Sequence, residues 1–271
     1  MRNLILLKER KGAKRKITIV SSILFAIALF QSAASAYDYV YIDDGANHVI
    51  GDDTFQNSYI VLDYHTANNP GTHFQIVDGG NVWQFSTYNN STITVDGGSI
   101  SNMIIGSSNS EIVVDGGTVG TIWADGHSSV TVNGGAINGF ISAFGNGTAE
   151  VRGGTLLNAI QAWNSGKIYL YGNSFSVGGI ELSYGDSLQD YGVIGGANNA
   201  NLTGTITGTL LDGSLLNTEF FLPLNNPGGA DIIVVPEPAT ITLLLTAGVL
   251  FLRRRRLPNS FLSGKSCISE F

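Results

Sequence analysis

The chain has 271 residues, of which 35 are glycine and one is cysteine, and its formal net charge is −7. The charge is unevenly distributed, because residues 37–235 hold 18 Asp and Glu but only two basic residues, Arg152 and Lys167. Such an acidic surface repels phosphate backbones, which argues against nucleic-acid binding. A single cysteine, Cys267, excludes an intrachain disulfide.

The N-terminal residues 1–36 are organised as a secretory signal peptide. Seven Lys and Arg precede an apolar run at 17–30, and the sequence Ala-Ser-Ala at 34–36 has small residues where signal peptidase requires them. An apolar run of 14 residues is short for a membrane span. We therefore predict a signal helix that is cleaved between Ala36 and Tyr37, with an uncleaved anchor as the alternative.

Residues 37–73 are rich in Tyr and Asp. Runs at 37–42 and 59–62 contain alternating or β-branched residues, which predicts two strands. We expect this segment to form an N-terminal cap that shields the apolar end of the repeats from water.

Glycine pairs recur through residues 74–180 at steps of 18 or 19 residues, and a degenerate sixth copy follows at Gly172-Asn173. The five pairs are Gly79-Gly80, Gly97-Gly98, Gly116-Gly117, Gly134-Gly135 and Gly153-Gly154. Self-similarity at such a short, fixed period is typical of a solenoid.

Apolar residues occupy matching positions in these copies. One column precedes the glycines and comprises Val77, Val95, Val114, Val132, Val151 and Leu170; a second follows them and comprises Phe85, Ile104, Ile122, Ile141 and Ile160. Apolar and polar residues alternate around both columns, which predicts short strands with one face inward, and the Gly, Asn and Ser clusters predict bends. We predict an all-β fold: a right-handed parallel β-helix (β-solenoid) of about six 18–19-residue coils.

The C-terminal third departs from the strict period. We predict that residues 181–235 form irregular coils and a C-terminal cap. A rigid Pro-Glu-Pro segment (Pro236, Glu237, Pro238) then precedes an apolar run at 239–252 and the arginines Arg253, Arg254, Arg255 and Arg256. The apolar run predicts a transmembrane helix of about 21 Å, which is marginal against a hydrocarbon core of about 30 Å. The arginines predict a stop-transfer signal that stays in the cytoplasm.

This three-part pattern at 236–256 resembles the PEP-CTERM sorting signal of Gram-negative bacteria. The resemblance implies that an exosortase-type membrane protease recognises Pro236, Glu237 and Pro238, after a transient stay in the inner membrane. It also implies export to the cell surface or extracellular matrix of a bacterium that makes exopolysaccharide. The tail at 257–271 departs from the family pattern, which ends near the arginines. The repeats separately resemble the passenger stalks of autotransporter adhesins.

Two groups of residues are candidates for binding. Asp78, Asp96 and Asp115 each precede a glycine pair, and stacked coils would align their carboxylates at about 5 Å, a spacing suited to a structural calcium ion. The alternative is that Asp before Gly simply forms turns.

Tyr88, Trp123, Phe144 and Trp163 lie at outward or corner positions, where exposed aromatic rings can stack on sugar rings, and Trp123, Phe144 and Trp163 are the candidates for glycan stacking. The alternative for this set is corner packing or cap contacts.

Many parallel β-helices are polysaccharide lyases or hydrolases, but this is an analogy of fold alone. A lyase needs basic residues, and a hydrolase needs two carboxylates in a cleft. The short, uniform coils have no long inserted loops with which to build one. We therefore predict no catalytic residues and no cofactor other than possible calcium. The predicted function is a structural or adhesive protein associated with exopolysaccharide or biofilm, with a glycan-binding module as the alternative and a polysaccharide-degrading enzyme less favoured.

Overall fold

The computed structural model describes residues 37–65, 71–195, 201–225 and 227–236. Tyr37 is the first of them. The predicted signal peptide with Ala36, Glu237 and Pro238, the C-terminal transmembrane helix, Arg253, Arg254, Arg255 and Arg256, and the tail at 257–271 lie outside these residues. In the described part of the chain, no helix is long and apolar enough to cross a membrane.

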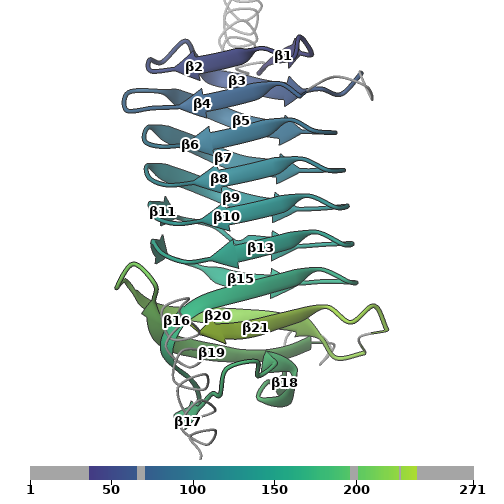
Figure 1. Ribbon diagram of the computed structural model, residues 1–271, viewed down its shortest axis with the longest axis vertical. Helices are drawn as coiled ribbons and strands as arrows, with labels where there is room; N and C mark the ends of the chain where they lie inside the picture. The colour runs from purple at the N-terminus through teal and green to yellow at the C-terminus, as the bar shows by residue number, and fades with distance from the viewer. Residues whose placement is uncertain (1–36, 66–70, 196–200, 226, 237–271) are drawn as a thin grey trace, which may run out of the picture. The chain divides into compact units, whose positions relative to one another are not determined.

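From Tyr39 onward the described residues form one compact unit, an all-β solenoid as predicted from the glycine repeats, with about seven turns where about six coils were expected. Figure 1 shows the strands of the regular coils stacked one above another from β1 (Asp38–Ile42) to β16 (Lys167–Val177). Within the described ranges, eight parallel strands in register form one ladder. They are β2 (Asn47–Ile50), β4 (His73–Ile76), β6 (Thr92–Val95), β8 (Glu111–Val114), β10 (Ser129–Val132), β13 (Thr148–Val151), β16 (Lys167–Val177) and β21 (Asp231–Pro236).

A second ladder runs beside the first and contains a corner. In its early turns each coil contributes one long strand with a register shift at the corner, as between Ile100 and Met103. In later turns the strand is split at the corner into two short strands. The ladder comprises β1 (Asp38–Ile42), β3 (Phe55–Leu62), β5 (Asn81–Thr87), β7 (Ser99–Gly106), β9 (Thr118–Ala124), β11 (Ala136–Ile137), β12 (Ile141–Ala143), β14 (Thr155–Leu156), β15 (Ala159–Ala162) and β20 (Leu215–Pro223).

The core consists of the inward columns of both ladders. One column aligns Ile60, Phe85, Ile104, Ile122, Ile141, Ile160 and Phe220, all of which are buried. Because side chains alternate between the two faces of a strand, each inward residue packs on its counterparts in the coils above and below. Each coil therefore depends on its neighbours for burial.

One predicted column is wrong by one residue in the first repeat. Ile76, not Val77, pairs with Val95, and Ile76 is fully buried whereas Val77 is only half-buried. The backbone explains the shift, because the left-handed residue is the first glycine of the pair at Gly79 (φ +88°) but the second at Gly98 (φ +61°). The one-residue difference between the first repeat and the next therefore lies in the glycine turn.

The C-terminal turns interrupt the parallel pattern. β16 runs beyond its coil and pairs antiparallel with β19 (Asn201–Leu210), which forms a hairpin with β20. β20 then rejoins the second ladder parallel to β15, and β21 completes the first ladder parallel to β16. The short elements β17 (Ile180–Glu181), η1 (Leu188–Asp190) and β18 (Val193–Gly195) lie along the connection between β16 and β19.

Asp212, in the turn of the β19–β20 hairpin, ties this hairpin to the coils. One carboxylate oxygen accepts a hydrogen bond from Gly154 N at 2.8 Å, and the other accepts from Ser214 N and Oγ at 2.8 and 2.6 Å. Partial burial works to raise the pKa of Asp212, but the hydrogen bonds outweigh it and hold this pKa below its usual value.

Candidate functional site

The predicted acidic column is not continuous in the structure. Asp96 N donates to Ile76 O, and Asp115 N donates to Val95 O. Asp96 and Asp115 therefore occupy matching positions in successive coils. The matching position in the coil before Asp96 is occupied by Val77, not by Asp78. All three carboxylates are exposed. Asp96 accepts from Gln75 Nε2, and Asp115 accepts from Asn133 Nδ2 at 2.7 Å.

The described residues contain no group of three or more His, Cys, Asp or Glu side chains arranged to hold a metal ion. The carboxylates of Asp96 and Asp115 act instead as acceptors for amide side chains of the adjacent coil. A calcium role for the column stays a prediction.

The three predicted aromatic residues lie close together on one side of the solenoid. Trp123 points outward from β9, and its ring centroid lies 5.5 Å from that of Phe144. Phe144 N donates to Ala124 O and Trp163 N donates to Ala143 O, which places Phe144 and Trp163 at matching positions in successive coils. All three side chains are half-buried.

Trp123 has an additional feature. Its indole Nε1 is buried and has no hydrogen-bond partner in the described part of the protein. Its neighbour in register on the next coil, Ser142, is fully buried and accepts instead from Gln161 Nε2 at 2.6 Å.

A larger aromatic group, of which the sequence analysis singled out only Tyr88, lies on the first turns. We call it the tyrosine cluster, and it comprises Tyr39, Tyr41, Tyr59, Tyr64, Trp83 and Tyr88. Ring centroids lie 4.8 Å apart for Tyr39–Tyr59 and 6.4 Å for Tyr59–Trp83. They lie 6.5 Å apart for both Tyr39–Tyr41 and Tyr41–Tyr64, and 5.1 Å for Tyr64–Tyr88. The rings therefore form one connected surface.

Alternation along β1 explains why this surface faces outward. Val40 and Ile42 pack against the core, so the intervening Tyr39 and Tyr41 point away from it and are 61% and 53% exposed. The signal was present in the sequence as tyrosines at every second position from residue 37, but the pairing of β1 with β3 supplies the other rings.

The rings lie over polar side chains on the outer face of β5. Gln84 and Ser86 point outward, opposite the inward Phe85, yet both are buried. The hydroxyl groups of Tyr59 and Ser86 are hydrogen-bonded at 2.6 Å, and Asn102 Nδ2 donates to Gln84 Oε1 at 2.7 Å. Burial raises the pKa of Tyr88 above its usual value, and the nearby Tyr59 and Tyr64 add to this effect.

Buried and half-buried carboxylates accept hydrogen bonds close to Tyr64. Asp63 is fully buried and accepts from Thr72 N and Thr72 Oγ1, both at 2.7 Å. Asp43 accepts from Tyr64 N at 3.0 Å, and its second oxygen lies 2.9 Å from His65 Nδ1.

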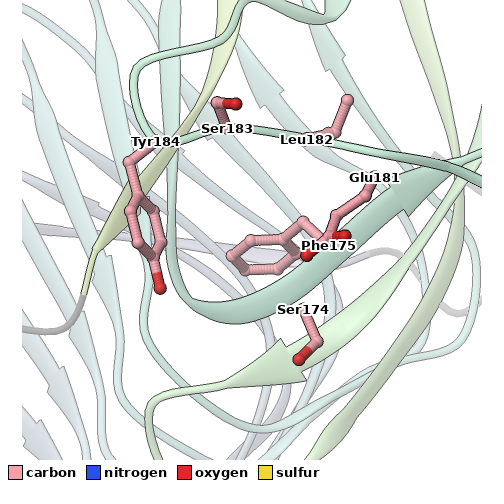
Figure 2. Close-up of a pocket in the computed structure, with 6 residues that line it drawn as sticks. All are labelled: Ser174, Phe175, Glu181, Leu182, Ser183 and Tyr184. Atoms are coloured by element: carbon pink, nitrogen blue, oxygen red, sulfur yellow. The ribbon is translucent and has the colours of Figure 1, made fainter.

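Two clefts open near the C-terminal turns. The first, of about 370 Å³, is lined by Ser174, Phe175, Glu181, Leu182, Ser183 and Tyr184, and Figure 2 shows the ring of Phe175 between Tyr184 and Glu181. The second, of about 460 Å³, is lined by Leu157, Asn158, Thr205, Asn217, Thr218 and Glu219. Each of these clefts is lined by a single carboxylate.

The two basic residues of the solenoid line neither cleft. Arg152 Nη2 lies 2.6 Å from Glu150 Oε2, and its guanidinium lies 5.1 Å from the ring centroid of Tyr171. Lys167 Nζ lies 3.9 Å from Asp231 Oδ2. Both cations therefore lie beside acidic side chains on the coil surface.

The Pro-Glu-Pro segment begins inside the last strand. Pro236 is the final residue of β21 and is in register with Gly172, while Val234 is fully buried in the core. The free edge of β21 is partly covered, because Gly185 N donates to Val234 O at 2.9 Å and Ser187 forms a bridge with Ile233.

The fold and this C-terminal segment together define an exported β-solenoid protein. Residues 234–256 match the PEP-CTERM protein-sorting motif, which confirms the prediction made from Pro236, Glu237 and Pro238. The motif implies export, a transient membrane anchor and processing by an exosortase. No curated protein and no solved structure matches the chain.

Proposed function

We propose that this protein is a structural or adhesive component of the extracellular matrix or cell surface of a Gram-negative bacterium, where it associates with exopolysaccharide. The observation that carries the proposal is the direct junction of the last solenoid strand, β21, to the sorting motif at Pro236. Because the solenoid makes up almost all of the described chain, it is the part that the sorting signal delivers.

A non-catalytic role is consistent with the chemistry of the solenoid. A glycosidase needs two carboxylates on opposite sides of the bond that it cleaves. Each of the two clefts near the C-terminal turns is lined by only one, Glu181 or Glu219. A lyase needs an available cation, and Arg152 and Lys167 both lie beside carboxylates. The enzyme hypothesis would be supported by the release of reducing ends or unsaturated sugars from a polysaccharide.

Intact-mass measurement of the protein from native cells tests the proposal. Matrix, outer-membrane and inner-membrane fractions are compared. We expect a species in the matrix that begins at Tyr37 and ends near Pro236. A species confined to the inner membrane that still contains residues 257–271 would contradict the matrix location.

A matched pair of variants links this result to the motif. The double variant Pro236→Ala/Pro238→Ala should accumulate unprocessed in the inner membrane. Pro227→Ala changes an exposed proline outside the motif and should be processed like the natural protein.

A second candidate function, glycan binding through Trp123, Phe144 and Trp163, is favoured by the contact between Trp123 and Phe144 and by the unpartnered indole nitrogen of Trp123. Trp123→Ala or Trp163→Ala should then abolish retention on the host polysaccharide without unfolding the protein. Unchanged retention in both variants would exclude these residues as the binding site.

A further inference from the structure

We propose that the tyrosine cluster binds a neutral, hydroxyl-rich polysaccharide chain. This inference rests on the proposed function for its setting outside the cell and names the class of ligand and its place on the solenoid. The cluster is separate from the group of Trp123, Phe144 and Trp163, because it lies on strands β1, β3 and β5 and the turns that follow β3 and β5.

The rings are not required to fill the core. The inward positions of these turns are already occupied by residues such as Ile60 and Phe85, which are fully buried. Tyr39, Tyr41 and Tyr64 are more than half exposed, at 61%, 53% and 56%. A connected group of large exposed aromatic side chains of this kind marks an interaction site rather than ordinary surface.

The chemistry of the cluster suits a sugar chain. The planes of Tyr39 and Tyr41 are inclined by only 21°, so these two rings present similarly oriented faces to the solvent. The apolar C–H face of a sugar ring can stack on such a ring, and the phenol hydroxyl at its edge can hydrogen-bond to sugar hydroxyls. The remaining rings extend the surface along the second ladder.

The charge of the surface argues against an anionic ligand. Between Lys16 and Arg152 the sequence contains no Lys or Arg, and Asp43 and Asp44 lie close to the cluster in the chain. An anionic polysaccharide would be repelled by this surface, as would a second copy of the same acidic protein. A neutral polysaccharide has neither penalty.

The surface is held in place before any ligand arrives. Asp43 accepts from Tyr64 N, the buried carboxylate of the adjacent Asp63 accepts from Thr72, and the hydroxyl groups of Tyr59 and Ser86 are hydrogen-bonded. Rigid side chains that are already ordered lose little conformational freedom on binding. The side chains of the cluster are therefore already ordered for binding.

Affinity electrophoresis of the full-length protein tests the inference. The gels contain dextran, a soluble β-glucan or galactomannan as neutral probes, and a polyuronate as an anionic probe. We expect retardation by at least one neutral probe and none by the polyuronate. The variant Tyr39→Ala/Tyr41→Ala should bind about tenfold more weakly or worse, because it removes two aromatic contacts.

Three controls distinguish a specific loss of binding from other effects of the substitutions. Tyr184→Ala removes a 48% exposed tyrosine outside the cluster and should bind normally. Tyr39→Phe/Tyr41→Phe retains the rings and should restore most of the affinity. The thermal midpoint of Tyr39→Ala/Tyr41→Ala should match that of the natural protein, because both side chains are exposed.

Several results would overturn the inference: retardation by none of the neutral probes, equal binding of the polyuronate, or unchanged binding by the Tyr39→Ala/Tyr41→Ala variant. Sedimentation that shows a dimer in the natural protein and a monomer in this variant would instead identify the cluster as an interface between copies. A protein that reaches the matrix but binds no neutral probe overturns this inference alone. One that binds but stays in the inner membrane overturns only the proposed function.

Discussion

The close stacking of coils at the glycine pairs makes a quantitative prediction for Gly117→Ala. Gly117 has a φ of +72°, and a Cβ built on it would lie 2.4 Å from Gly97 O and 2.7 Å from Gly98 O. Gly213, in the turn between β19 and β20, has a similar φ of +88° but no atom within 4 Å of a built Cβ. The two glycines therefore share the backbone conformation and differ in the proximity of the neighbouring coil.

The expected losses of stability follow from this difference. A left-handed conformation costs a non-glycine residue about 1–2 kcal/mol, which both variants incur. At Gly117 the backbone of the preceding coil must also move, which adds about 1–3 kcal/mol on the scale of overpacked cores. Gly213→Ala should thus destabilise by about 1–2 kcal/mol, and Gly117→Ala by about 2–5 kcal/mol.

Thermal denaturation followed by circular dichroism measures this difference. At roughly 2–4 °C per kcal/mol for a domain of this size, the midpoint of Gly117→Ala should lie about 2–12 °C below that of Gly213→Ala. Equal midpoints for the two variants would refute the reasoning, because the contact with the preceding coil would then cost nothing.

Further predictions concern the core, pH and calcium. Ile122→Ala, at a fully buried position of the inward column, should reduce the free energy of unfolding by about 2–5 kcal/mol, whereas Leu215→Ala, at an 81% exposed position, should change it by less than about 0.5 kcal/mol. Similar effects of the two changes in urea denaturation would be inconsistent with the inward column. Asp212→Asn should destabilise near neutral pH, because the lowered pKa of Asp212 means that folding favours its charged form. That difference should persist above the ordinary Asp pKa of about 3.9 and vanish as pH falls through the lower folded value; a difference independent of pH would exclude the charge as its cause. Calcium should raise the thermal midpoint of the natural protein but not of Asp96→Asn if the acidic column binds it, and equal midpoints with and without calcium would remove the calcium hypothesis.

The sequence predicted the solenoid well because its inward positions repeat. Ile104, Ile122 and Ile141 recur at nearly constant spacing, and the structure aligns them in one column. The sorting motif was predictable for a different reason, since it is a contiguous segment whose parts follow one another in the chain.

The alignment of individual turn residues was not predictable, because the coils differ in length by one residue. Coils of 18 and 19 residues both close, and the sequence does not reveal which turn residue absorbs the difference. The first repeat therefore places Ile76 where Val77 was expected and Val77 where Asp78 was expected. Similarly, the degenerate copy at Gly172-Asn173 was expected to continue the repeat, but β16 runs on, pairs antiparallel with β19 and leaves the coil.

The tyrosine cluster was missed as a group because its members come from different strands, and the alternation of Tyr39 and Tyr41 does not reveal which other rings lie beside them. Tyr39 and Tyr41 belong to β1, Tyr59 to β3, and Tyr88 follows β5. These residues meet only because successive turns of the coil bring them together, so their proximity depends on the register of strands that are distant in sequence.

The in-register ladder also bears on how such a chain can change over generations. Glu111 begins strand β8, and Ser129, which begins β10 in the next coil, pairs with it in register. Deletion of residues 111–128 would therefore join Ser110 to Ser129 and leave every remaining column aligned. Duplication of the same stretch would insert one more coil of about 4.8 Å. Unequal recombination between repeats can thus alter the reach of the protein in whole steps, while both ends, with the first tyrosines and the exit towards Pro236, are inherited intact.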